Sequence, residues 1–372
     1  MAESTGMSTH TRTPWRAGLL TAALLLTLGS CSSAGGTEPG AVTVPRTSPS
    51  ASRPPAPLLT KYAYLHPDGD YFGVSTYHAP APAATDAVTD AAGKHPTVLE
   101  YFQSWAQDFD PADVASSYAQ GALPLLTWEP DGGTTAADQP DYSLKRIASG
   151  DFDAYVIKFA MAVKAQRRPI VLRFAHEMNG SWYPWSEGNN GNTPADYVKA
   201  WRHVHDLFSA VGATNVIWLW SPNVVRGTSD TDLSDFYPGD QYVDWMGVDA
   251  YGFGEKTAAE VLDPTTRILY KISHKPLLIA ETGSAPGPRQ AGWTADLFRW
   301  IKRNPRTIGF VWFQHSKDQG GQYDYRFDVS PLTRTAFQQG LDSLHLRTWP
   351  VPTTAATTAK PTSPATASGK ES

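Results

Sequence analysis

Eight short apolar runs that alternate with amphipathic segments predict a closed (β/α)₈ barrel. The predicted barrel occupies residues 61–349 of the 372-residue chain as a single domain. A domain of this size buries about three quarters of the surface of its unfolded chain. Runs such as Leu277–Ala280 are apolar on both faces, which is expected of strands that pack inside the barrel and are covered outside by helices.

The predicted strands are spaced along the whole domain. They are Tyr71–Tyr77, Pro96–Phe102, Ala122–Trp128, Ile170–Ala175, Val216–Trp220, Val243–Asp249, Leu277–Ala280 and Ile308–Phe313. Polar or aromatic residues stand where these runs end. Because the C-terminal ends of barrel strands converge on one face, residues scattered in the sequence are expected to meet there.

The segments between the strands carry helix signals. From Phe152 the apolar residues follow helical spacing, and Ser149 or Asp151 is placed to cap this helix. A second helix is predicted to begin at Thr193–Pro194, an N-cap followed by a proline at the first helical position, and to end near Gly212. The last two predicted helices are Trp293–Ile301 and Arg334–Leu344.

Residues 1–30 are predicted to be an export signal. Arg12 and Arg16 precede an apolar stretch, Ala17–Leu28, that is too short to span a bilayer as a stop-transfer helix. The stretch ends in Leu28–Gly–Ser–Cys31, which resembles a bacterial lipoprotein box, where the cysteine receives a diacylglycerol. Cys31 is the only cysteine, so it cannot form an intramolecular disulfide. The alternative is an ordinary signal peptide with an incidental cysteine.

The segments that flank the domain offer little to bury. Residues 31–60 and 350–372 are rich in Ser, Thr, Pro and Ala, so we expect a tether at one end and a disordered tail at the other. A lipidated Cys31 would anchor the domain to the outer face of the bacterial cell membrane. The net charge of −5 comes from scattered charges without a basic run, which argues against a nucleic-acid partner. We expect a monomer.

Two glutamates stand at the ends of apolar runs, Glu177 after the fourth predicted strand and Glu281 after the seventh. A buried strand that ends in an unpaired charge costs free energy, so such a carboxylate has a partner or a function. Glycoside hydrolysis requires one carboxylic acid that protonates the leaving oxygen and one carboxylate that attacks or activates water. For a lone glutamate, the structural alternative is a buried ion pair, for instance with Arg173.

The stretch His176–Trp182, with the sequence His-Glu-Met-Asn-Gly-Ser-Trp, resembles the acid/base motif of family 26 glycoside hydrolases. The resemblance extends over most of the domain and includes Trp218–Asn223, Val248–Tyr251, Ile279–Thr282 and Phe310–Phe313. The family consists largely of endo-β-1,4-mannanases, and some members act on mixed-linkage β-glucan or β-1,3-xylan.

The resemblance implies a retaining, endo-acting enzyme that cleaves a β-1,4-linked polysaccharide by double displacement, with mannan as the favoured substrate. A β-glucanase or xylanase is the alternative within the family. Glu177 would be the acid/base and Glu281 the nucleophile, with their carboxyl groups about 5–5.5 Å apart. The alternative from another class is a non-catalytic, glycan-binding surface lipoprotein, although a binding protein has no need for two acids at strand ends.

The resemblance also implies roles for neighbouring residues. Tyr251 resembles the family tyrosine that hydrogen-bonds the nucleophile, and Trp312 resembles the tryptophan that floors the subsite of the cleaved sugar. Trp182 lies where the family stacks a sugar on the leaving-group side. His176 is expected to contact the sugar or the nucleophile, and the alternative is that it fixes the geometry of its neighbours. Core packing is the alternative for the other three residues.

Trp105 and Trp128 end the second and third predicted strands, where a sugar subsite and core packing are both open interpretations. Arg173 is predicted to point into the barrel and to pair with a carboxylate, provided that side chains alternate along its strand. We expect no metal and no organic cofactor. The metalloprotease pattern His-Glu-x-x-His would require a second histidine at position 180, where Gly180 stands.

Overall fold

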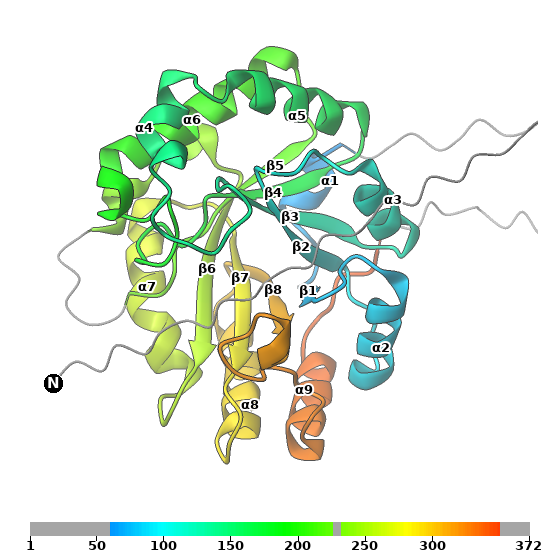
Figure 1. Ribbon diagram of the computed structural model, residues 1–372. Coiled ribbons are helices and arrows are strands. Elements are labelled where there is room, and N and C mark those ends of the chain that lie inside the picture. The colour runs from blue at the N-terminus through cyan, green and yellow to red at the C-terminus, as the bar shows by residue number, and fades with distance from the viewer. Residues whose placement is uncertain (1–59, 226–231, 350–372) are drawn as a thin grey trace, which may run out of the picture. The chain divides into compact units, whose positions relative to one another are not determined.

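The computed structural model describes residues 60–225 and 232–349, so the predictions for Cys31, the tether and the tail lie outside the described residues. Eight parallel strands close into a barrel in chain order, with β8 paired to β1 (Figure 1). This confirms the predicted (β/α)₈ barrel. The strands are β1 (Tyr71–Thr76), β2 (Val98–Ser104), β3 (Leu123–Glu129), β4 (Ile170–Phe174), β5 (Val216–Trp220), β6 (Trp245–Gly252), β7 (Leu277–Ser284) and β8 (Thr307–Gln314).

The helices surround the strands (Figure 1). They are α1 (Tyr62–Leu65), α2 (Pro82–Ala92), α3 (Pro111–Ala119), α4 (Leu144–Ser149), α5 (Asp153–Ala165), α6 (Pro194–Val211), α7 (Ala258–Ile272), α8 (Gln290–Arg303) and α9 (Pro331–Ser343). Short 3₁₀ turns occur at Pro140–Tyr142, Asn189–Gly191, Leu233–Phe236, Asp240–Tyr242 and Lys317–Gln319. Among the helices of the described residues, none is long and apolar enough to cross a membrane.

The predicted ends of α6 are confirmed, whereas the predicted N-cap of α5 is wrong. Thr193 caps α6 through a reciprocal pair of hydrogen bonds with Asp196, and Gly212 ends this helix with a left-handed φ of 75°. In α5 the N-cap residue is Phe152, without a side-chain cap. Ser149 and Asp151 do not cap α5, because Ser149 is the last residue of α4 and the chain turns before α5 begins.

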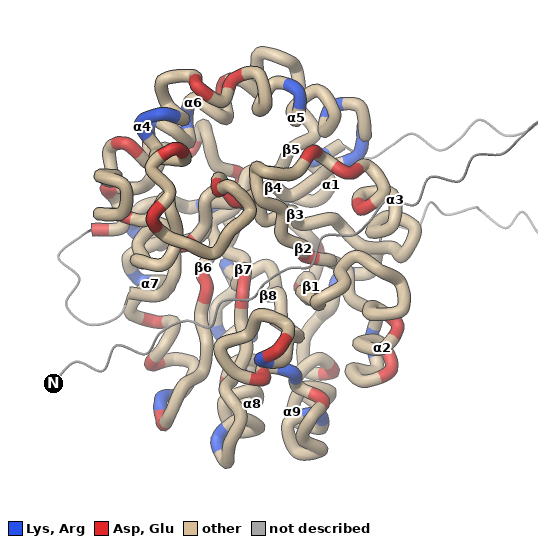
Figure 2. The backbone as a smooth tube through the Cα atoms, in the orientation of Figure 1, with Lys and Arg blue, Asp and Glu red and all other residues tan. Residues whose placement is uncertain are grey.

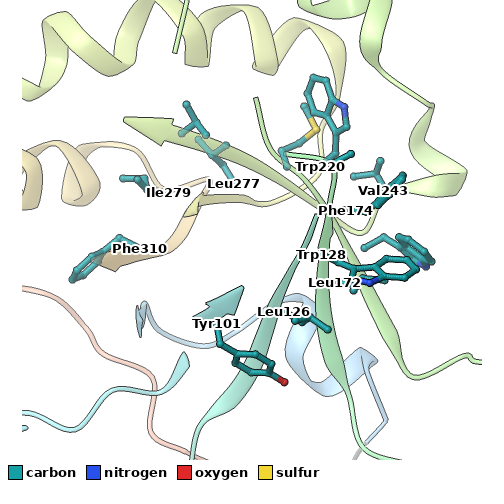
Figure 3. Close-up of a cluster of buried hydrophobic side chains, with 14 of the residues drawn as sticks. Tyr101, Leu126, Trp128, Leu172, Phe174, Trp220, Val243, Leu277, Ile279 and Phe310 are labelled. Carbon is teal, nitrogen blue, oxygen red and sulfur yellow. The ribbon is translucent and has the colours of Figure 1, made fainter. Parts of the chain in front are cut away.

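Side chains alternate between two apolar layers along the strands. One layer fills the barrel and includes Leu125, Val171, Ile217, Leu278 and Val311, which come from five different strands. The other layer lies between the strands and the outer helices, and Figure 3 shows part of it. Its labelled members include Leu126, Trp128, Leu172, Phe174, Ile279 and Phe310. The parity of a residue along its strand therefore decides which layer it enters.

A β-bulge changes this parity at the end of β7. Val248 of β6 pairs with Ile279, but the next residue, Asp249, pairs with Glu281, so Ala280 is an extra residue in β7. Ile279 belongs to the outer layer and Ala280 to the inner one. Strict alternation would return Glu281 to the outer face. Because the bulge inserts one residue, Glu281 points into the barrel.

Candidate active site

Arg173 of β4 joins three carboxyl groups inside the C-terminal end of the barrel. Its Nη1 atom lies 3.0 Å from Glu100 Oε1, and its Nη2 atom donates to Glu281 Oε1 and lies 3.5 Å from Asp249 Oδ2. The side chain of Arg173 is fully buried. The prediction that Arg173 points inward and pairs with a carboxylate is confirmed. Figure 2 shows acidic positions on β6 and β7 at the centre of the molecule, as well as on the outer helices.

Glu281 accepts hydrogen bonds on both carboxyl oxygens. Arg173 donates to Oε1, and the phenol of Tyr251 donates to Oε2 over 2.7 Å. Burial, together with the negative charge of Glu281, raises the pKa of Tyr251 well above its ordinary value, so this phenol keeps its proton and remains a donor. The predicted contact between Tyr251 and Glu281 is therefore present.

Glu177 is held by a different set of neutral donors. Asn223 Nδ2 donates to its Oε1 atom, and the indole N–H of Trp182 donates to Oε2 over 2.7 Å. Asn223 is fixed in turn by Asn179, whose amide exchanges two 2.9 Å hydrogen bonds with the Asn223 backbone. Burial, reinforced by the charge of Glu281, raises the pKa of Glu177 to about 7. This carboxyl group can therefore carry a proton at mildly acidic pH.

The backbone at the end of β4 is strained. Ala175 has a φ of 44° and Glu177 a φ of 52°, the left-handed region that residues other than glycine seldom adopt. The turn is held by the surrounding contacts, since the Glu177 N–H donates to Ser221 O over 2.8 Å and the Trp185 indole donates to His176 O over 2.6 Å. Such strain is found at sites whose side chains need a fixed direction.

His176 is buried between aromatic rings. Its Nε2 atom lies 3.0 Å from the Tyr183 hydroxyl and 3.8 Å from Glu281 Oε1, and the Tyr183 ring stacks on Trp185 with 4.4 Å between centroids. Burial and the charge of Arg173 lower the pKa of His176 well below its ordinary value, so the imidazole is neutral. His176 thus lies beside Glu281, as predicted, and within the aromatic cluster of Tyr183 and Trp185.

Comparisons with known proteins agree with this geometry. The model of glycosyl hydrolase family 26 matches residues 131–290, which include both glutamates. Endoglucanase H of Acetivibrio thermocellus is 31% identical over 278 residues, which cover 70% of this chain and 29% of that protein. The chain thus spans less than a third of that relative.

The region of residues 131–290 belongs to glycosyl hydrolase family 26.

Two further comparisons cover more of the matched protein. A mannan endo-1,4-beta-mannosidase of Bacillus subtilis is 22% identical over 283 residues, which cover 64% of this chain and 72% of that protein. A modular endo-β-1,4-mannanase from Cellulomonas fimi superposes with a TM-score of 0.62 at 21% identity, covering 76% of this chain and 73% of that one. The second comparison shows a shared fold.

The structure corrects the sugar contact predicted for Trp312 and decides for core packing at Trp105 and Trp128. Trp128 stacks on Phe159 of α5 with 4.3 Å between centroids, and Trp105 packs against Trp128. Trp312 packs edge-on against Phe337 of α9 with 5.1 Å between centroids. All three belong to the outer layer and are buried. They therefore face the helices, and the structure does not support their contact with sugars.

Phe313 takes the inward position on β8. Val311 lies in the inner layer, so Phe313, two residues later, points to the same side and is only partly buried. Its ring stacks on His315 with 4.0 Å between centroids and meets Phe102 and Tyr251 edge-on. The apolar wall beside Glu281 is thus made by Phe313 and Phe102, two residues that the motif comparison did not single out.

The inner polar residues Glu100, Asp249 and Asn223 were not predicted as site residues. Glu100 and Asp249 lie within apolar strands, and a charged residue in such a strand was the available signal. Across the described residues, there is no group of three or more His, Cys, Asp or Glu side chains that could hold a metal ion.

Proposed function

We propose that this chain is a retaining endo-β-glycanase in which Glu281 is the nucleophile and Glu177 the acid/base, and that its substrate is β-1,4-mannan. One observation carries the proposal: two buried carboxyl groups on one barrel face have opposite environments. Glu281 accepts from a guanidinium and a phenol, which stabilise a carboxylate. Glu177 has neutral donors and a pKa raised to about 7 by burial and the nearby charge of Glu281. Such a divergence suits an acid and a nucleophile.

In the first step, an oxygen of Glu281 attacks the anomeric carbon and forms a covalent bond to it. The bond between that carbon and the bridging oxygen breaks, and the proton of Glu177 passes to the departing oxygen. Arg173 and Tyr251 fix the carboxylate of Glu281 for this attack. Asn223 and Trp182 direct the carboxyl group of Glu177 toward the leaving oxygen.

In the second step, Glu177 removes a proton from a water molecule. The water oxygen attacks the anomeric carbon on the face that the leaving group occupied, and the bond to Glu281 breaks. Two displacements at one carbon retain its configuration. This mechanism predicts a separation of about 5–5.5 Å between the two carboxyl groups.

β-Glucan is the second candidate substrate. The 31% identical relative is named an endoglucanase, whereas the Bacillus subtilis relative, at 22% identity, is named a mannan endo-1,4-beta-mannosidase. Mannan is preferred because several relatives and solved structures that the chain resembles are named mannanases. The hydroxyl contacts that distinguish the two sugars belong to loops, which vary most within a barrel family.

A panel of mannan, galactomannan, barley β-glucan and xylan tests this proposal. The wild type is expected to release reducing ends fastest from mannan, and a Glu281→Ala variant is expected to lose hydrolysis by a factor on the order of 10⁴ or more while it still binds the polysaccharide. Equal activity in both proteins would refute the nucleophile assignment. Fastest release from barley β-glucan would replace mannan with the second candidate.

We further propose that Cys31 is lipidated and that the enzyme is a monomer anchored to the outer face of the cell membrane. The sequence Leu28–Gly–Ser–Cys31 supports the anchor. In the producing cells, a Cys31→Ser variant is expected to move from the membrane fraction to the medium and to lose incorporation of labelled fatty acid. Retention of both membrane association and label in that variant would contradict the anchor.

A further inference from the structure

Glu100 extends from β2 into the barrel, beneath the two proposed catalytic groups, and its side chain is fully buried. Its Oε1 atom accepts two hydrogen bonds, from Thr127 Oγ1 over 2.7 Å and from Arg173 Nη1 over 3.0 Å. Among the described residues, its Oε2 atom has no hydrogen-bond partner. An ionised Glu100 would therefore leave negative charge on a desolvated oxygen, which is unfavourable.

The charges around Arg173 do not balance if every carboxyl group is ionised. Glu100, Asp249 and Glu281 lie within ion-pair distance of its guanidinium, and the charge of Glu177 also acts on it. Four carboxylates with this one guanidinium would leave a net charge of −3 in the barrel. His176 adds no positive charge, because burial and Arg173 lower its pKa well below the ordinary value. Some of the carboxyl groups must therefore hold protons.

The hydrogen bonds indicate which further carboxyl groups hold protons. Both oxygens of Glu281 and both of Glu177 accept hydrogen bonds. Glu100 Oε2 and Asp249 Oδ2 accept none from the part of the chain that the structure describes. Burial is the main cause that raises the pKa of Glu100 to about 8 and that of Asp249 well above its ordinary value, although Arg173 opposes both shifts. Glu100 and Asp249 therefore hold protons in addition to the one that Glu177 carries as the proposed acid.

We infer that Glu100 is a positioning residue that works as a neutral carboxylic acid, holding the Arg173 guanidinium toward Glu281 while leaving its positive charge to the nucleophile. The inference deepens the proposed function and rests on Glu281 as nucleophile. The guanidinium is a rigid planar fork. Because Nη1 is held by Glu100 and Nη2 donates to Glu281, the position of Glu100 sets the direction from which Glu281 receives its hydrogen bond. An ionised Glu100 would compete with Glu281 for the same cation.

Two substitutions separate the neutral from the ionised role. Glu100→Gln keeps an acceptor oxygen without a charge, so kcat is expected to stay within about threefold of the wild type. Glu100→Ala removes the acceptor and frees Arg173 to move, so kcat is expected to fall by a factor on the order of 100 with a smaller change in KM. Equal losses of kcat in both variants would show that Glu100 acts ionised, and an unchanged kcat in Glu100→Ala would show that it positions nothing. Either result overturns the inference.

Infrared difference spectroscopy tests the protonation directly and requires no hydrolysis. Subtraction of the Glu100→Gln spectrum from that of the wild type at pH 6 is expected to show the C=O stretch of a protonated carboxylic acid. The matched control is Glu260→Gln, because burial is absent at Glu260 and a backbone hydrogen bond lowers its pKa, so that difference should show only carboxylate bands. A carboxylate band for Glu100 would overturn the inference even if the enzyme were found to act on another substrate. The test also stands if Glu100→Ala fails to fold.

Discussion

The two faces of the barrel wall use side chains in contrasting ways at the C-terminal end. On the outer face, Trp128 and Trp312 are buried against α5 and α9. On the inner face, their neighbours Thr127 and Phe313 take part in the polar network and the apolar wall beside the glutamates. Adjacent residues of one strand therefore have different roles, because one packs against the outer helices and the next faces the glutamates. An aromatic residue at a strand end indicates a sugar subsite only when its parity points inward.

The inner face also differs in how its polar groups are satisfied. The outer layer consists of aliphatic and aromatic side chains whose contribution is buried apolar area, which stabilises the fold. The inner cluster places one guanidinium among three directly contacting carboxyl groups, which costs free energy unless protons are shared. The comparison predicts that substitutions on the inner face change rate and pH dependence, and that substitutions on the outer face change stability.

After Glu281→Ala, the largest expected effect comes from Glu177→Gln. Loss of the acid should lower kcat on polysaccharide by a factor on the order of 10²–10⁴. Burial and the charge of Glu281 raise the pKa of Glu177 to about 7, so the wild type should lose activity as pH rises through about 7. The variant should lack this alkaline limb of the pH–rate profile. A substrate with an activated leaving group should be affected less, since it departs without a proton. An alkaline limb that is identical in both proteins would contradict this assignment.

The next effect contrasts adjacent residues of β8. Trp312→Ala should lower the free energy of unfolding by about 3–5 kcal/mol, because it opens a cavity under α9, while KM stays unchanged. Phe313→Ala should raise KM by roughly tenfold, since the lost apolar wall beside Glu281 removes contact area, with a smaller loss of stability. Urea denaturation and initial-rate kinetics on both variants measure the contrast. A KM effect confined to Trp312→Ala would reverse the assignment of the two faces.

The barrel and the proposed catalytic pair could be predicted from the sequence, because both depend on local patterns: the apolar runs of the strands and the residues of one short motif. It was not sufficient for the face on which each side chain lies. Trp312 was expected to contact the sugar by motif resemblance, whereas the parity of Val311 puts Phe313 on the inner face and Trp312 on the outer one. The strand β7 was predicted to end at Ala280 because the apolar run stops there. The strand continues to Ser284 through residues that are not apolar.

The bulge in β7 shows why strand alternation alone could not predict the direction of the Glu281 side chain. Strict alternation from Leu278 would have sent Glu281 to the outer face, away from Arg173. The extra residue, Ala280, depends on the register between β6 and β7, which is a long-range property. Arg173 was predicted correctly because β4 keeps regular alternation from Val171, with both residues on the inner side.

The smallest expected effect concerns stability and pH on the inner face. Burial raises the pKa of Glu100 from an ordinary value of 4.5 to about 8, so the folded state binds a proton that the unfolded chain releases between these values. The stability that this proton contributes is fully present below about pH 4.5 and is lost as pH rises through about 8. Glu100→Gln should flatten this decline in urea denaturation at a series of pH values. Parallel declines in wild type and variant would contradict the prediction.

Capture of the covalent intermediate tests the central claim most directly. A 2-deoxy-2-fluoro-β-glycoside with an activated leaving group should label the enzyme, because the fluorine slows the second displacement more than the activated first one. Peptide mapping by mass spectrometry should then find one sugar attached to Glu281 and none to Glu177. A label on Glu177, or an inverted first product seen by proton NMR in the absence of any label, would contradict the double-displacement account.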